Sequence, residues 1–503
     1  MRTLRLLALL PALLLVSLPA MAATTLRIGL QEDPDALDPA QGVSFVGREV
    51  FAALCDKLVD VDRDMKLVPQ LATEWSWSSD AKTLTLKLRS GVKFHDGTAL
   101  DAAAVKANLD RYRGAPESKR KSELRAVTSV IAVDPQTVRI ELSEPYAPLL
   151  AVLADRSGMI LSPAALAKLG DKIGTTPVCS GPYKFAERVP QEKIAVERFP
   201  DYWNKDAIGI DRIEYVPVPD ATVRLANLQS GQFDIIERMA ATDVKAVAAD
   251  PKLQVVESTA LAYNLMSINT GNGAAADNPL GKDPRVRQAF ELAIDRKVLN
   301  DVVFEGRFVP SNQPEAPGSR YWDADHKVPG RDVAKAKALL AEAGATHPSF
   351  TLTAPNNTTD LQVAQTMQSM AAEAGFDMKI QATEAMTLVQ NTSSGNYQAS
   401  LAIWSGRPDP DGNISYWIAC DGFLNWGKYC NADLDKALAQ ARGTVDPEAR
   451  AKFYRAAADI YLSDRPVIFL YHYKWLWGVS RKVQGFMPNP DGIIRPQGIR
   501  LVQ

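Results

Sequence analysis

The chain has 503 residues, of which 46% are hydrophobic and 23% are charged, and its formal net charge at pH 7 is −2. This length is enough for two or three domains, each with its own core. The nearly balanced charge argues against a nucleic-acid-binding protein, because such proteins carry a marked excess of Lys and Arg. Four histidines without a Cys-x-x-Cys pair or a His-Glu-x-x-His motif predict no built-in metal site. We expect no cofactor.

The first 22 residues have the organisation of a secretory signal. Two arginines precede an apolar run at residues 6–18, and Ala20-Met21-Ala22 forms a cleavage site of the A-x-A type. No cysteine stands at the cleavage point for a lipid anchor. No later stretch approaches the roughly 18 apolar residues that a membrane-spanning helix needs. We therefore expect a mature protein that begins at Ala23 and is free in the periplasm, without a lipid anchor.

The first half of the mature chain contains clear strand and helix patterns. Residues 26–30 form a short apolar run typical of a first strand, and an acidic turn follows it. Leu84, Leu86 and Leu88 alternate with polar residues, which predicts a strand that is buried on one face. After a turn-rich link, the spacing of apolar residues predicts a helix over 101–114.

The second half alternates strands and helices. Asp283 followed by Pro284 is a typical helix start, and Asp332 opens another helix. Further along, the pattern predicts five elements with short links: a strand at 350–354, a helix at 360–374, a strand at 376–382, another helix, and a strand at 400–404. This alternation is typical of a parallel sheet with helical crossovers.

The last of these strands breaks into a loop rich in Gly, Pro, Asp and Arg at residues 405–413. Ligands commonly bind beyond the carboxyl ends of parallel strands, where such loops lie. Trp404 would supply an apolar wall, Gly406 the turn and Arg407 a cation. Asp409 would supply a carboxylate on a backbone that the flanking prolines stiffen. These four residues are the predicted ligand site.

Four cysteines in an exported chain favour disulfides. Cys420 and Cys430 are close enough in sequence to close a small loop, and we predict a disulfide between them. Cys55 and Cys179 would pair only if the fold brings them together, which the sequence leaves open.

Several short motifs follow one another along the chain. They lie at residues 69–75, 88–98, 105–109, 180–185, 201–203, 228–234, 286–290, 293–296 and 336–344. In this order, over nearly the whole mature chain, the sequence resembles the family-five extracellular solute-binding proteins. These are the peptide- and nickel-type receptors of ABC importers.

The resemblance implies an α/β fold of the periplasmic-binding-protein type, with two lobes, an extra inserted subdomain and a ligand cleft between the lobes. Mapped onto this chain, lobe one would comprise residues 23–50, 178–268 and 480–503. The inserted subdomain would comprise 51–177, and lobe two 269–479.

The resemblance also implies roles for site residues. In peptide-binding relatives an aspartate in the matching stretch pairs with the free amino group of the ligand, and Asp409 is the matching position. Dipeptide-type relatives have an arginine near the start of the helix at 360–374, facing the ligand carboxylate, whereas this chain has none there. Arg407 could serve as a substitute cation. Dipeptides, oligopeptides, nickel complexes, opines and glutathione-like compounds all stay open as ligands.

Two functional classes follow from these observations. The first is a monomeric periplasmic receptor that closes on a small peptide or peptide-like amphipathic ligand and delivers it to an inner-membrane ABC permease. Its lobes would move about crossing segments near 265–269 and 477–480. The second is an exported hydrolase that uses Asp409 and Asp411 as paired carboxylates. We favour the receptor, which is not an enzyme, because two aspartates one residue apart tend to diverge in direction.

Overall fold

The computed structural model describes residues 23–502, apart from 318 and 445. The predicted signal segment at residues 1–22 therefore lies outside the described residues.

One mixed sheet of 11 strands runs through the molecule. Its strands lie in the order β15-β14-β16-β12-β17-β11-β1-β10-β9-β8, and β13 pairs with β17. The strands are β1 (Thr25–Leu30), β8 (Tyr183–Val189), β9 (Lys193–Arg198), β10 (Arg212–Pro217), β11 (Ile235–Ile236), β12 (Leu253–Ile268), β13 (Val309–Pro310), β14 (Ser349–Pro355), β15 (Asp377–Thr383), β16 (Ala399–Trp404) and β17 (Val467–Ser480).

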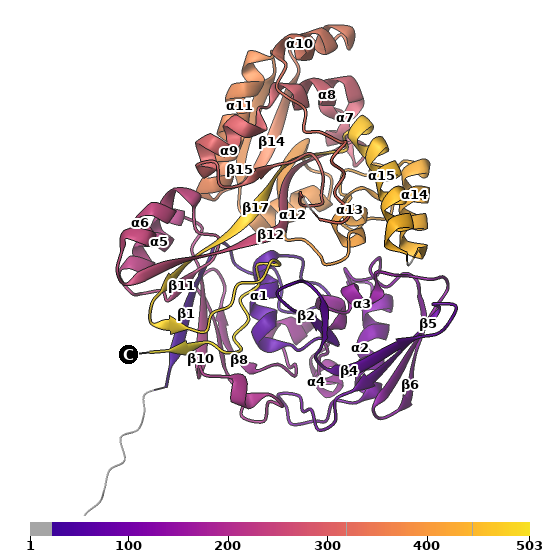
Figure 1. Cartoon of the computed structure of the whole chain (residues 1–503), viewed down its shortest axis with the longest axis vertical. Coiled ribbons are helices and arrows are strands. Elements are labelled where there is room, and N and C mark those ends of the chain that lie inside the picture. The colour runs from indigo at the N-terminus through magenta and orange to yellow at the C-terminus, as the bar shows by residue number, and fades with distance from the viewer. Residues whose placement is uncertain (1–22, 318, 445, 503) are drawn as a thin grey trace, which may run out of the picture.

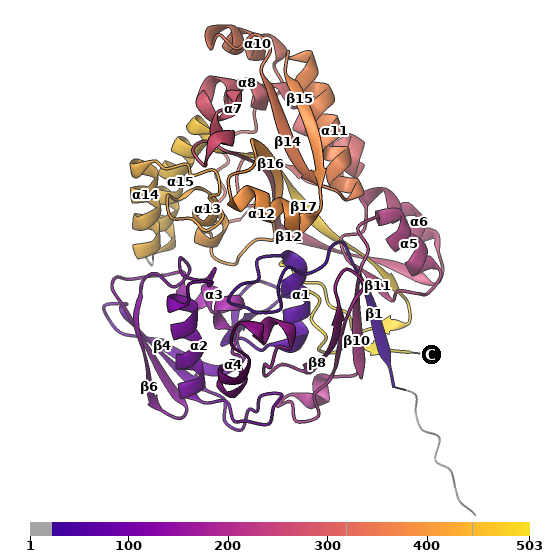
Figure 2. The same cartoon turned by 180° about the vertical axis from the view of Figure 1, so that it is seen from behind.

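Two long strands, β12 and β17, join the two halves of the molecule. They pair antiparallel with each other along most of their length. One end of β17 pairs with β11 in the lower half (Figure 1), and the end of β12 at residues 263–268 pairs with β16 in the upper half (Figure 2). The register shifts between Thr259 and Tyr263, so the ladder is interrupted at residues 260–262.

The upper half contains the predicted parallel unit. β14 pairs in parallel with both β15 and β16, and the intervening helices return the chain to the same edge. The strands predicted at 350–354, 376–382 and 400–404 are confirmed within two residues at each end. The helices of this half are α7 (Pro279–Lys282), α8 (Pro284–Ala293), α9 (Arg296–Phe304), α10 (Val333–Glu342), α11 (Thr358–Glu373), α12 (Ala385–Ser393), α13 (Asp411–Ile418), α14 (Ala432–Gly443) and α15 (Pro447–Asp464).

The lower half contains a second, separate sheet of four antiparallel strands in the order β4-β5-β7-β6. Its leucines at 84, 86 and 88 are buried, as the alternation predicted. The strands and helices of the lower half are β2 (Val59–Val61), β3 (Leu67–Pro69), β4 (Ala72–Trp77), β5 (Thr83–Leu88), β6 (Val127–Asp134), β7 (Thr137–Leu142), α1 (Phe45–Leu54), α2 (Ala102–Gly114), α3 (Leu149–Val152), α4 (Pro163–Leu169), α5 (Ala221–Gln229) and α6 (Val244–Ala249).

Three hydrophobic clusters fill the molecule. One lies within residues 40–160 around the four-stranded sheet, and one within 263–469 around α13, α14 and α15. The largest contains side chains from Leu26 to Ile499 and follows the large sheet through both halves. The lobe boundaries given above stay a prediction.

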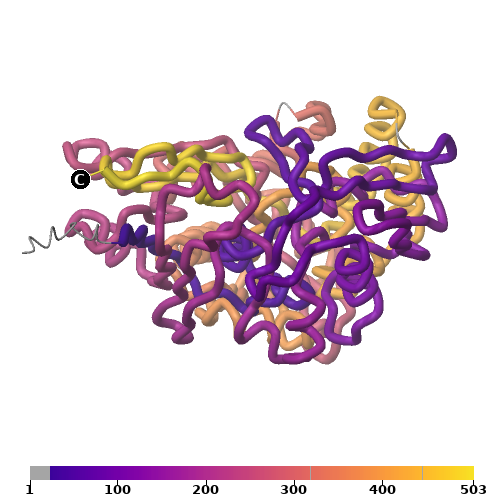
Figure 3. Tube along the Cα trace, turned by 90° about the horizontal axis from the view of Figure 1, so that it is seen from below, coloured from indigo at the N-terminus to yellow at the C-terminus, as the bar shows by residue number. Residues whose placement is uncertain are grey.

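The chain ends against the lower half. The short strands β18 (Val483–Gln484) and β19 (Arg500–Leu501) pair with each other, and Figure 3 shows this yellow segment lying along magenta parts of the chain. The backbone N–H of Ile494 donates to Glu49 Oε2 at 2.7 Å, and Arg495 contacts Asp60 at 3.1 Å. The last residues are thereby fixed to α1 and β2.

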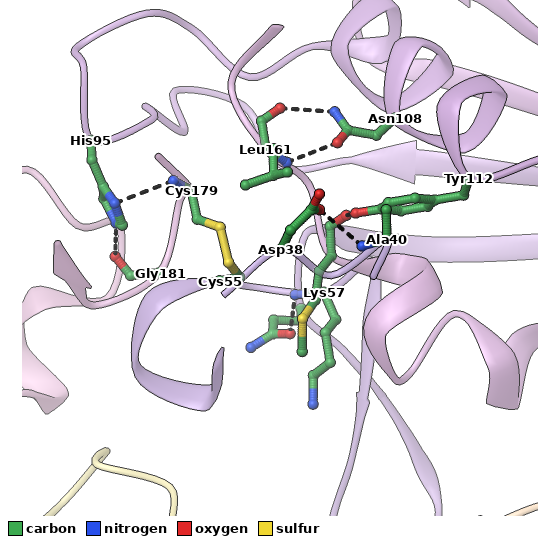
Figure 4. The surroundings of a disulfide bond; sticks show 12 residues. Asp38, Ala40, Cys55, Lys57, His95, Asn108, Tyr112, Leu161, Cys179 and Gly181 are labelled. Carbon is green, nitrogen blue, oxygen red and sulfur yellow. Dashed lines mark hydrogen bonds between the residues drawn. A yellow bond between two sulfur atoms is a disulfide. The ribbon is translucent and has the colours of Figure 1, made fainter. Parts of the chain in front are cut away.

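Two disulfides are present. Cys420 is bonded to Cys430, as predicted, and Cys55 is bonded to Cys179, the pairing that the sequence left open. Beside the second bond, His95 accepts a hydrogen bond from the backbone N–H of Cys179 at 3.3 Å through Nδ1 (Figure 4). Its Nε2 must then carry the proton that it shares with the carbonyl oxygen of Gly181 at 3.1 Å. His95 is a structural residue here.

We expect the two disulfides to stabilise the protein by different amounts. The bond between Cys55 and Cys179 closes a loop of sequence separation 124, and that between Cys420 and Cys430 one of 10. Loop-closure entropy then predicts losses of about 5 and about 3 kcal/mol for the two pairwise Cys→Ala variants. Urea unfolding of both variants measures the difference, and an equal or reversed order would contradict it.

A buried histidine makes stability depend on pH. Burial lowers the pKa of His472 from 6.5 to about 4. The folded protein keeps this side chain neutral. Its contribution to the free energy of unfolding is therefore complete above about pH 6.5 and is lost as the pH falls toward about 4. The loss amounts to about 2 kcal/mol at about pH 5. In urea unfolding, His472→Gln should reduce this pH dependence, to which the buried His95 contributes in the same direction, whereas His347→Gln, at an exposed site, should leave it unchanged.

Candidate functional site

A cavity of about 120 Å³ lies between the two halves, beside the end of β16. The lower half contributes residues 32–33, 43–45 and Arg156, and the upper half contributes Pro355 and residues from β16, α12 and the segment that follows β16. Most of its walls are apolar. The large apolar side chains include Phe45, Leu388, Ile403, Trp404, Trp417 and Trp426, and the charged ones are Glu32, Asp33, Arg156 and Arg407.

Trp404, at the end of β16, forms part of the cavity wall. Its indole N–H donates to Asn413 Oδ1 at 3.1 Å, and the rings of Tyr416 and Trp417 meet it edge to face. These contacts come from α13, the helix that follows the loop. The indole therefore has one fixed orientation, with 5% of the residue exposed.

Gly406 has a positional role rather than a place in the cavity wall. Its φ is +79°, and a Cβ built on it would lie 2.3 Å from the Cβ of Leu261. Only glycine combines this backbone conformation with so close an approach of the interrupted part of β12. The residue thus fixes where the loop leaves the sheet.

Arg407 lines the cavity and contacts the lower half. Its Nε lies 2.8 Å from Asp155 Oδ2, and its guanidinium carbon lies 4.1 Å from the centre of the Trp404 ring. The backbone N–H of Arg407 donates to Asn413 Oδ1 at 2.7 Å. A second contact between the halves runs from Arg48 Nη1 to Ser405 Oγ at 2.7 Å. The loop after β16 is thereby fixed from both sides.

Asp409 does not line this cavity. Its two carboxylate oxygens accept hydrogen bonds from Arg450 Nη1 and Nη2, each at 2.7 Å, and the residue lines only a small space of about 10 Å³. Burial raises the pKa of Asp409, while the Arg450 guanidinium opposes this shift. The carboxylate that we expected to meet a ligand amine is engaged with α15 instead.

Asp409 and Asp411 also do not form a carboxylate pair. Asp411 lies 3.3 Å from Arg442 and accepts a hydrogen bond from Ser415. Each aspartate therefore has its own arginine. This divergence removes the geometric basis of the hydrolase alternative, which needs two carboxyl groups facing one substrate.

The acidic side of the cavity is a feature that the sequence analysis missed. Glu32 and Asp33 follow β1 directly and reach the cavity from the lower half. Asp33 lies 2.9 Å from Arg188, but its Oδ1 is buried without a partner. Glu32 lies 3.3 Å from Arg238. The acidic turn after the first strand was the available signal.

A smaller cavity of about 30 Å³ is lined by Arg238 and by the start of α11. The resemblance described above implies an arginine at the start of this helix in dipeptide-type relatives. This chain has Thr359 and Asp360 there. The cations of this cavity are Arg238 from the lower half and Lys474 of β17. Tyr473 and Trp475 of β17 complete its wall.

The described ranges, 23–317, 319–444 and 446–502, contain no group of three or more His, Cys, Asp or Glu side chains that could hold a metal ion. In the same part of the chain, no helix combines the length and the apolar character that crossing a membrane requires.

We expect Asp409→Asn to reduce stability. Asp409 and Arg450 are 14% and 7% exposed at their side chains, so the substitution leaves a buried guanidinium without its counter-charge. Breaking one partner of a buried pair typically costs about 3 kcal/mol or more. Thermal unfolding of the ligand-free variant measures this loss, with Asp421→Asn as the control at a more exposed ion pair. An unchanged melting temperature would show that the pair has no structural role.

Comparisons with known proteins agree with this fold. The family described as bacterial extracellular solute-binding proteins, family 5 middle, matches residues 66–425. The glutathione-binding protein GsiB of Pectobacterium atrosepticum is 32% identical over 493 residues, which is 95% of this chain and 94% of that protein. GsiB of Escherichia coli K12 is 31% identical over 485 residues, 94% of this chain and 93% of that protein.

Solved structures match over the same extent. The PBP AgaA from A. tumefacien R10, in complex with agropinic acid, is 30% identical with a TM-score of 0.86, and the match covers 95% of this chain and 99% of that one. A dipeptide-binding protein of Pseudoalteromonas sp. SM9913, with Met-Leu, has a TM-score of 0.88 at 24% identity, over 95% and 100% of the two chains. These matches confirm the two-lobed periplasmic-binding-protein fold. The chain therefore belongs to the bacterial extracellular solute-binding proteins of family 5, and it is a substrate-binding protein rather than an enzyme.

Proposed function

We propose that this protein is the periplasmic receptor of an ABC importer that captures a small peptide or peptide-like amphipathic ligand. The cavity between the halves carries this proposal. It combines mainly apolar walls with carboxylates from one half and guanidinium groups from both. Binding sites for small ligands typically combine apolar walls with a few placed polar groups in this way. The captured ligand passes to an inner-membrane permease.

The relatives support a ligand of this size and polarity. The GsiB proteins are named for binding glutathione, and AgaA and the Pseudoalteromonas protein hold agropinic acid and Met-Leu. Within this chain, Trp404 and Arg407 are the proposed ligand contacts from the predicted set, and Gly406 places them. Asp409 is left to its pair with Arg450, and Glu32 and Asp33 take its proposed role as the partners of a cationic group.

Capture requires that the two halves separate and close again. We assign β12 and β17 as the strands that bend when the halves move. Within β12, the interrupted ladder at residues 260–262 is the proposed hinge. This position lies a few residues before the crossing segment at 265–269 expected from the sequence. Ligand contacts on both halves would then favour the closed form.

The mature protein is proposed to begin at Ala23 and to be a free monomer in the periplasm. Mass spectrometry of protein released by osmotic shock should give a chain without residues 1–22. Light scattering should give the mass of one such chain. Recovery in the membrane fraction alone, or an intact Met1, would contradict this.

The ligand class can be tested directly. Calorimetric titration with Met-Leu, glutathione, agropinic acid and nickel–histidine should show binding of at least one of the first three. Small-angle scattering with that compound should show contraction of the molecule as the halves close. Trp404→Ala should weaken the same titration about tenfold or more, because it removes a large buried apolar wall. Turnover of the compound, or binding of nickel–histidine alone, would contradict the proposal.

A further inference from the structure

Four arginines and two carboxylates form a buried cluster beside the large cavity. The guanidinium groups exceed the carboxylates by two, so the cluster carries an excess of two positive charges. Every member is at most 7% exposed. The members are Arg48, Arg120, Arg156, Arg407, Glu123 and Asp155.

Asp155 is the centre of this cluster. Its carboxylate lies 2.8 Å from Arg407, 3.2 Å from Arg48 and 3.8 Å from Arg156. Burial alone would raise the pKa of Asp155, but the surrounding guanidinium groups hold it well below its usual range. The other carboxylate, Glu123, lies 2.5 Å from Arg120 and accepts a hydrogen bond from Ser157. Both carboxylates are thus fully engaged.

The arginines are not fully satisfied. Burial and the positive charge of Arg120 lower the pKa of Arg156 to about 9. Burial likewise lowers the pKa of Arg407. Among the described residues, Arg407 Nη2 and Arg156 Nε have no hydrogen-bond partner, the nearest carboxylate oxygen to Arg156 Nε being that of Asp155 at 3.8 Å, and both residues line the cavity. Burying charged donors without an acceptor is unfavourable, so this wall of the cavity favours an anion.

We propose, on the basis of the proposed receptor function, that this cluster is an anion subsite. The ligand carries a carboxylate that binds Arg407 Nη2 and Arg156 Nε, while an apolar part of the same ligand lies against Trp404. Arg407 already gives its Nε to Asp155 and its Nη1 to the carbonyl oxygen of Gly406, so it offers the ligand only its Nη2 amino group rather than a bidentate fork. This wall therefore disfavours a ligand that has no anionic group.

Asp155 competes with the ligand for the same guanidinium. It is the nearest carboxylate to Arg407, and it comes from the lower half whereas Arg407 comes from the upper. Removing the charge of Asp155 would raise the excess of positive charge from two to three and would release Arg407 Nε. The proposal therefore predicts opposite effects for the two partners of one ion pair, which a purely structural pair would not produce.

The test compares two probes of the same shape. The carboxylate probe is 3-phenylpropionate and the neutral control is 3-phenylpropanamide, each titrated by calorimetry into the mature wild-type protein. We expect the carboxylate to bind about tenfold or more tightly than the amide. Arg407→Gln should abolish this preference, and Asp155→Asn should increase it. Arg125→Gln removes the same charge from an ion pair outside the cavity and should leave the preference unchanged.

Two results would overturn the anion subsite. One is equal binding of both probes, or of neither, by the wild-type protein, a comparison that needs no variant to fold. The other is a parallel loss of both probes in Arg407→Gln and Asp155→Asn, which would show that the pair only holds the halves together. Inorganic phosphate distinguishes the type of anion, because tighter binding of phosphate than of 3-phenylpropionate would exclude a carboxylate subsite. The receptor function itself is judged separately, by the titrations with Met-Leu, glutathione and agropinic acid.

Discussion

The ion pair between Asp155 and Arg407 is the contact on which the site depends. Its two partners come from opposite halves of the molecule and meet at the wall of the cavity. A buried pair of this kind contributes to stability only when further hydrogen bonds support its charged groups. Here Arg48 supports Asp155 at 3.2 Å and also donates to Ser405 in the opposite half. The same side chains therefore join the halves and shape the site between them.

Backbone geometry brings Arg407 to this contact. The parallel strands around β14 end at one edge, and the chain leaves β16 there in a turn that needs a glycine at position 406. Asn413 of α13 then binds both the indole of Trp404 and the backbone N–H of Arg407. The disulfide between Cys420 and Cys430 follows directly after α13 and limits the freedom of the segment beyond it. Local elements thus fix a side chain whose partner is distant in sequence.

The periodic parts of the fold could be read from the sequence, and the pairing of charges could not. The pattern of apolar and polar residues predicted β5, β14, β15, β16 and the loop after β16, because such patterns depend on residues close together in the sequence. The role of Asp409 depends on Arg450 of α15, which lies 41 residues further along the chain. No sequence motif identifies Arg450 as its partner. Arg407 was identified as a candidate cation, but neither Asp155 nor the excess of arginines around it follows from any local pattern. The pairing of Cys55 with Cys179, across a separation of 124, was open for the same reason.

Charge and closure are coupled in this architecture. Bringing the halves together removes water from guanidinium groups that outnumber the nearby carboxylates, and desolvating an uncompensated charge is costly. An anionic group that enters between the halves compensates part of this cost and at the same time contacts residues of both halves. The apolar walls favour closure around any ligand of suitable shape, because the apolar area that closure buries does not depend on the charge of the ligand. On the anion-subsite proposal, specificity lies with the arginines, and in the ligand-free form Asp155 is the carboxylate that contacts Arg407 across the two halves.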